Sequence, residues 1–156
     1  MVAVSALGLL IPFLGSADAL AQRAQPLAGS CTVNAQFPHV SSTAGKGIDA
    51  KSSFGCDGSA TANVTNVLIN LYLCSSAPPQ GTRESDWGNY GCAVVSQAAY
   101  TDVGVVSANN KPVRMVPKSG SGEAHGNGYW AQCTQWAING VSQTRVGSIN
   151  PNRLSA

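Results

Sequence analysis

The sequence has few charged residues, few aromatic rings and only two histidines. Charged residues make up 10% of the 156 residues and aromatic residues 6%, whereas an ordinary soluble domain carries roughly 25% charged residues. This scarcity excludes a coiled coil, a long helical bundle and a charge-rich disordered chain. The formal net charge of +2 is also too small to predict a nucleic-acid-binding surface.

Several motifs of catalysis are missing as well. The chain contains no Gly-x-Ser-x-Gly, no His-Glu-x-x-His and no phosphate-binding loop. The cysteines form no Cys-x-x-Cys pair, and neither His39 nor His125 lies at a zinc-finger spacing from a cysteine pair. We therefore predict no metal site and no cofactor.

The amino-terminal segment is the longest apolar run in the chain. Residues 2–14 are apolar apart from Ser5, and small residues then occupy the two positions that precede a signal-peptidase cleavage site, in Ala19-Leu20-Ala21. This pattern predicts a signal peptide over residues 1–21 and a secreted, extracellular domain over residues 22–156. The alternative is a retained membrane anchor, which needs about 20 apolar residues; Pro12 and Asp18 interrupt the run.

Alternation of apolar and polar residues predicts strands along the rest of the chain. The strand-like runs cover residues 31–37, 48–56, 61–74, 92–96, 98–106, 113–116, 129–138 and 141–149. Asn139-Gly140 predicts a tight hairpin turn before the last run. Because no segment repeats with the 3.6-residue period of a helix, the predicted fold is all-β with little or no helix. It is an antiparallel β-sandwich, immunoglobulin-like in architecture and stabilised by disulfides.

All five cysteines lie in the predicted secreted domain, where an oxidising environment favours disulfides. Cys31 and Cys56 fall on the apolar faces of neighbouring strand-like runs, which favours a buried bridge between them. A second bridge, between Cys74 and Cys92, would close the base of the loop that separates two runs. Cys133 is then left over as a buried thiol or a link to another chain, and other pairings stay open.

Two tryptophans dominate the candidate ligand-binding residues. In the run at residues 129–138, alternation places Trp130, Gln132 and Trp136 on one face and Cys133 on the other. If Cys133 points to the core, the tryptophan face points outward, where it can stack on sugar rings or bury into a protein partner. Two alternatives stay open: the rings fold over the edge of the sandwich, or the strand has the opposite orientation.

The polar segment at residues 75–91 is a second candidate. It carries Arg83, Trp87 and Tyr90 among proline, glycine and serine residues, and a cysteine borders each end. Charged and aromatic residues in a loop tied at both ends are typical of a recognition loop on a rigid scaffold. The alternative is an ordinary solvated connection.

Three segments carry a resemblance to a known group. They are Cys31-Thr32-Val33-Asn34-Ala35-Gln36-x-Pro38-His39-x-Ser41, the following Lys51…Cys56, and Ala124-His125-Gly126-x-Gly128-Tyr129-Trp130. The chain resembles small secreted actinobacterial proteins of uncharacterised function. The resemblance covers most of the secreted part and implies export and a β fold, and it implies no catalytic residue.

Together these features predict an exported, non-enzymatic binding module. Its ligand is expected to be a cell-envelope or extracellular component, either a cell-wall glycan or a protein partner. One alternative is a small secreted hydrolase or hydrolase inhibitor that uses His125, close to Glu123, or the Glu84 and Asp86 carboxylates. Another is a structural surface protein that self-associates through Cys133.

Overall fold

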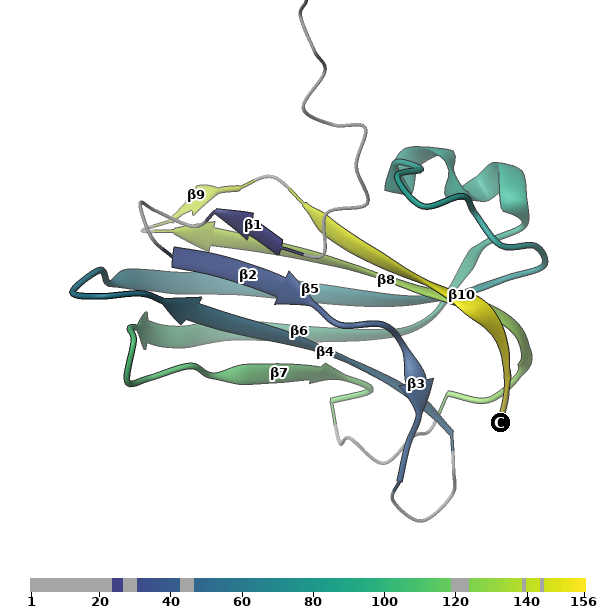
Figure 1. Cartoon of the computed structure of the whole chain (residues 1–156), viewed down its shortest axis with the longest axis horizontal. Helices are drawn as coiled ribbons and strands as arrows, with labels where there is room; N and C mark the ends of the chain where they lie inside the picture. Colours follow the sequence, from purple (N-terminus) through teal and green to yellow (C-terminus); the bar gives the residue numbers. More distant parts are fainter. Residues whose placement is uncertain (1–23, 27–30, 43–46, 119–123, 139, 144) are drawn as a thin grey trace, which may run out of the picture.

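The chain forms a sandwich of two antiparallel β-sheets (Figure 1). The structure is a computed structural model that describes residues 24–26, 31–42, 47–118, 124–138, 140–143 and 145–156. The predicted signal peptide, Glu123 and Asn139 lie outside the described residues. No helix within the described ranges is long and apolar enough to span a membrane.

Each sheet contains five of the named strands. The first sheet consists of β1 (Ala24–Pro26), β2 (Cys31–Ala35), β4 (Ile48–Cys56) and β3 (His39–Val40) in that order, with β7 (Val113–Val116) also paired to β4. The second consists of β10 (Val146–Ser155), β8 (Asn127–Ile138), β5 (Ala62–Cys74) and β6 (Ala93–Val106), with β9 (Val141–Ser142) also paired to β8. One 3₁₀ helix, η1 (Glu84–Tyr90), lies in the connection between β5 and β6.

The all-β sandwich predicted from the sequence is confirmed. The predicted run at residues 48–56 coincides with β4. The two runs predicted at residues 92–96 and 98–106 are one strand, because Gln97 between them stays in register with Asn70 of β5. Ile138 of β8 pairs with Val141 of β9; the turn predicted between them includes Asn139, which lies outside the described residues.

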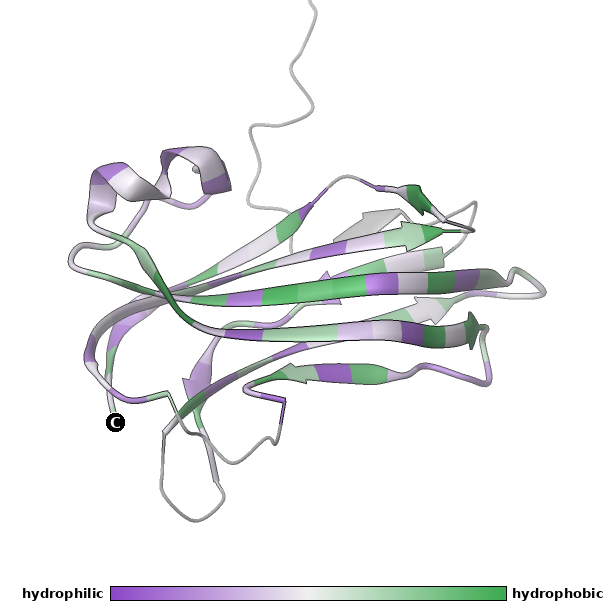
Figure 2. Cartoon of the chain, turned by 180° about the vertical axis from the view of Figure 1, so that it is seen from behind, coloured by the Kyte–Doolittle hydropathy of each residue, from purple (hydrophilic) through white to green (hydrophobic). Residues whose placement is uncertain are grey.

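Alternating side chains along each strand build the core between the sheets. Figure 2 shows apolar and polar residues alternating along the strands, as expected where one face of a strand is buried. In β2, Val33 and Ala35 point inward while the intervening Asn34 is exposed. Val64, Ile69 and other residues of β5 meet them from the second sheet.

Both predicted disulfides are present. Cys31 and Cys56 lie directly opposite each other on β2 and β4 and are buried in the core. This bridge joins neighbouring strands of one sheet, whereas the immunoglobulin bridge joins the two sheets. Cys74 and Cys92 form the second bridge, between the end of β5 and the start of β6. Each bridge is expected to stabilise the fold by about 2–4 kcal/mol.

Candidate functional site

The tryptophan face of β8 points into the core, so the predicted outward orientation is wrong. Trp130 is 0% exposed and Trp136 is 2% exposed, and both belong to the cluster between the sheets. The opposite orientation, which the sequence also allowed, is the one found. The two rings share one buried cluster with small side chains of the first sheet, among them Ala35 and Ala50.

Gln132 is also buried, between the two tryptophans, and holds the sheets together. Its side-chain Nε2 donates hydrogen bonds to the backbone oxygens of Lys51 and Gln36. Ser148 Oγ donates a further hydrogen bond of 2.7 Å to the same Gln36 oxygen. The amide therefore satisfies backbone groups where β2 ends, which is a structural role and leaves it unable to contact a ligand.

The connection at residues 75–91, here called the capping loop, lies at one end of the sandwich (Figure 1), where Trp87 packs against outward-facing residues of the second sheet such as Cys133 and Ile149. Trp87 is its anchor: the ring is 2% exposed and meets Tyr72 edge-on, with ring centres 5.0 Å apart. Gly147 makes the approach possible, because a Cβ added there would lie 3.2 Å from the Trp87 ring. Trp87 Nε1 also donates to the Thr82 oxygen at 3.0 Å. Trp87 therefore fixes the loop and is not itself a contact surface.

Polar links tie the same loop to the sheet. The Glu84 carboxylate accepts hydrogen bonds from the Tyr72 hydroxyl and from Arg145. Burial, followed by the hydrogen bond to Glu84, raises the pKa of Tyr72, and the hydrogen bond to Glu84 raises the pKa of Arg145. Gln80 adds a hydrogen bond of 2.8 Å to the Ile149 oxygen. The loop is thus held by side chains along its length as well as by the disulfide at its base.

Cys133 lies beneath the capping loop as a free thiol that is 1% exposed. Burial, and secondarily the charge of Glu84, raises its pKa to about 12. A thiol with so high a pKa is almost entirely protonated at neutral pH and is a poor nucleophile. A link to another chain through this residue requires the capping loop to move away.

The outer surface of the capping loop remains accessible. It forms an open hollow of about 510 Å³, within the size range of ligand sites. Of the sequence-predicted residues, Arg83 and Tyr90 line this hollow, while Trp87 faces the sheet. Asp86, which the sequence offered as a hydrolase carboxylate, also lines the hollow. The lining residues that the sequence did not single out are Gln80, Gly81, Thr82 and Asn89.

Of the residues considered for hydrolysis, Glu84, Asp86 and His125 are described, whereas Glu123 lies outside the described residues. Glu84 is engaged by two partners, and His125 is exposed on the segment before β8. His39 has both ring nitrogens occupied, with Nδ1 3.1 Å from the Phe37 oxygen and Nε2 2.8 Å from Asp49 Oδ1. The described part of the chain also contains no cluster of three metal-ligating side chains.

Comparison with known protein families, with curated proteins and with solved structures finds no match to this chain. The resemblance to small secreted actinobacterial proteins therefore stays a prediction.

Proposed function

We propose that the protein is an exported, non-enzymatic binding module that recognises a polar glycan through the hollow of the capping loop. The observation that carries this proposal is the hollow itself, which lies on a loop fixed by a disulfide, a buried ring and several hydrogen bonds. A loop that is already ordered loses little conformational entropy when a ligand binds.

The lining of the hollow favours a polar and nearly neutral ligand. The side-chain amides of Gln80 and Asn89 can both donate and accept hydrogen bonds, and the carboxylate of Asp86 accepts them. The Tyr90 ring adds an apolar surface with a polar tip. The positive charge of Arg83 and the negative charge of Asp86 cancel, so the lining has no net charge. Hydroxyl groups around a sugar ring complement this combination of groups.

Two features support export. Four of the five cysteines are joined in two disulfides, and such bonds persist mainly in oxidising compartments. The amino-terminal sequence independently predicts a signal peptide over residues 1–21. Both features support a ligand among cell-envelope or extracellular components.

Co-sedimentation with insoluble peptidoglycan and with chitin tests the proposal. Replacing Asn89 and Tyr90 by alanine removes an amide and a ring from the hollow without touching the anchor Trp87. We expect the double variant to bind about tenfold more weakly, since these contacts together contribute about 1.4 kcal/mol.

A matched control replaces Asn109 and His125, which are exposed elsewhere, by alanine. This control should bind like the wild type, because neither side chain lines the hollow. Equal losses in both double variants would contradict the proposal, as would turnover of either polysaccharide that disappears with His125→Ala. Variants of Trp130 or Trp136 are unsuitable here, because both rings are part of the core.

A further inference from the structure

A groove between β6 and β7 lies on a different part of the sandwich from the capping loop. Its volume is about 480 Å³. Tyr100 of β6 crosses it, and its hydroxyl donates a hydrogen bond of 2.7 Å to the Met115 oxygen and accepts one of 3.2 Å from the Met115 nitrogen. A side chain thus occupies the place that another strand would take beside β7, and the ring is held in one position.

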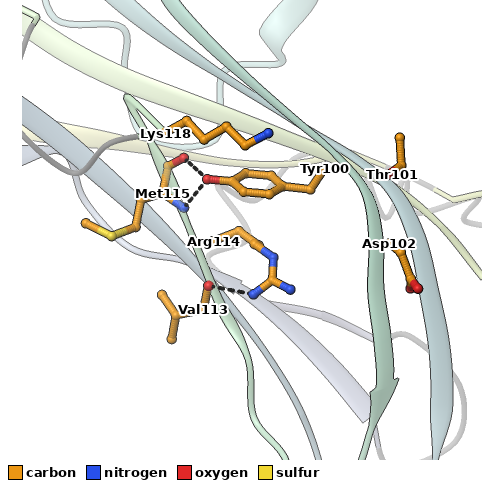
Figure 3. Close-up of a pocket in the computed structure, with 7 residues that line it drawn as sticks. All are labelled: Tyr100, Thr101, Asp102, Val113, Arg114, Met115 and Lys118. Atoms are coloured by element: carbon orange, nitrogen blue, oxygen red, sulfur yellow. Dashed lines mark hydrogen bonds between the residues drawn. The ribbon is translucent and has the colours of Figure 1, made fainter.

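Two cations lie on opposite sides of the Tyr100 ring (Figure 3). The Lys118 Nζ atom is 5.0 Å from the ring centre and the Arg114 Cζ atom is 5.4 Å from it. Each cationic side chain donates one hydrogen bond to the backbone: Lys118 donates to the Ala99 oxygen at 3.1 Å, and Arg114 donates to the Val113 oxygen at 3.0 Å. A lysine has three N–H donors and an arginine five, so donors remain for a ligand.

The groove is therefore positively charged and pre-organised. Among the described residues that line it, Asp102 is the one acidic residue, against the two cations. The ring faces orient both cations through cation–π attraction, which reduces the entropy lost when they contact an anion. A ligand with two negative charges along its length would meet both cations at once.

We propose that this groove binds a linear acidic polysaccharide whose carboxylates contact Arg114 and Lys118. The alternatives fit less well. Strand addition by a peptide needs free backbone groups, but Tyr100 already bonds Met115 and Lys118 already bonds the Ala99 oxygen. Stacking of nucleic-acid bases needs an open aromatic face, and cations cover both faces of this ring. A polymer recognised by its repeating charges meets neither obstacle.

Titration of the full chain with polygalacturonate, followed by calorimetry at low salt, tests the proposal. Arg114→Gln with Lys118→Gln should weaken binding at least tenfold, because two charge contacts are lost together. Lys111→Gln with Arg153→Gln removes the same charge from exposed residues outside the groove and should change affinity less than threefold. Asp102→Asn leaves the packing around Tyr100 in place and should tighten binding about twofold to threefold by removing the repelling charge.

Three outcomes would overturn the proposal. One is an equal loss in the two double variants, which would mean attraction to net charge alone. Another is equal binding of polyglutamate, polyphosphate or duplex DNA, which would remove the preference for an acidic polysaccharide. The third is no binding of polygalacturonate by the wild type. Because the groove and the hollow of the capping loop share no lining residue, failure here leaves the peptidoglycan and chitin result standing.

Discussion

The capping loop and the Tyr100 groove both combine aromatic rings with charged side chains, but they use them in opposite ways. In the loop, Trp87 is buried against the sheet and Glu84 is neutralised by Arg145. In the groove, Tyr100 holds Arg114 and Lys118 at an open surface. The same residue types therefore stabilise the fold in one region and present charge in the other.

This difference shows why residue type alone is a weak guide to a binding surface. Trp87 belongs to a loop rich in polar residues, which favours a recognition role, yet its ring lies in a buried apolar cluster with Cys133 and Ile149. Tyr100 lies in an ordinary strand, β6. Its surroundings are distinctive because β7 and Lys118, which come later in the chain, lie beside it. Whether a ring anchors or presents depends on what the fold packs against it.

Removal of the anchor Trp87 should have the largest effect on stability. We expect Trp87→Ala to lower the free energy of unfolding by about 3–5 kcal/mol, since a large buried ring is lost from the outer face of the second sheet. Denaturant titration monitored by circular dichroism measures this change. Tyr90→Ala, on the exposed side of the same loop, is the control and should cost about 1 kcal/mol or less. A similar cost for both would mean that Trp87 does not anchor the loop.

A smaller effect is expected in the groove. Tyr100→Phe keeps the ring between the two cations but removes the hydroxyl that bonds the Met115 nitrogen and oxygen. The loss of two hydrogen bonds should lower the free energy of unfolding by about 1–2 kcal/mol. Affinity for polygalacturonate should change less than in Arg114→Gln with Lys118→Gln, because both charges remain. An unchanged stability would show that solvent replaces the hydroxyl without cost.

The thiol beneath the capping loop should have the smallest effect at neutral pH. Its pKa is raised from the ordinary value of 9.0 to about 12, so the thiolate fraction in the folded chain is about 1000-fold smaller than in the unfolded chain. Cys133 should therefore resist iodoacetamide at pH 8 and react after denaturation. Trp87→Ala, which loosens the loop, should speed the reaction in the folded protein, and rapid labelling of the wild type would contradict the burial.

Cys133 also makes the stability of the fold depend on pH, and the sign of this dependence follows from its raised pKa. The unfolded chain loses the Cys133 proton near pH 9, whereas the folded chain keeps it until about pH 12. Stability from this group is therefore complete below about pH 9 and falls as the pH rises toward 12. Tyr72, whose pKa burial also raises, contributes to the same loss, so wild type and Cys133→Ala must be compared to isolate the thiol.

The sequence predicted much of the fold and little of the candidate sites. Period-two alternation located β2, β4 and β5, and cysteine positions on those strands predicted both disulfides. Of the predicted ligand-binding residues, only Arg83 and Tyr90 line a surface hollow. The sequence carried one sign of the groove: Lys111, Arg114 and Lys118 lie close together in the chain with no acidic residue between them.

Local pattern determined which segments are strands, because a strand needs only its own alternating residues to acquire one apolar face. It did not determine which face of β8 lies inward, since a central strand can bury both faces. In the fold both faces of β8 are covered, one by the first sheet and the other by Trp87 of the capping loop. Likewise, Tyr100 and Lys118 meet only because β6 and β7, at the edges of different sheets, are packed side by side. Contacts between elements distant in sequence are the product of tertiary packing. The groove is built from such contacts, and the hollow depends on them because they hold the capping loop against the sheet.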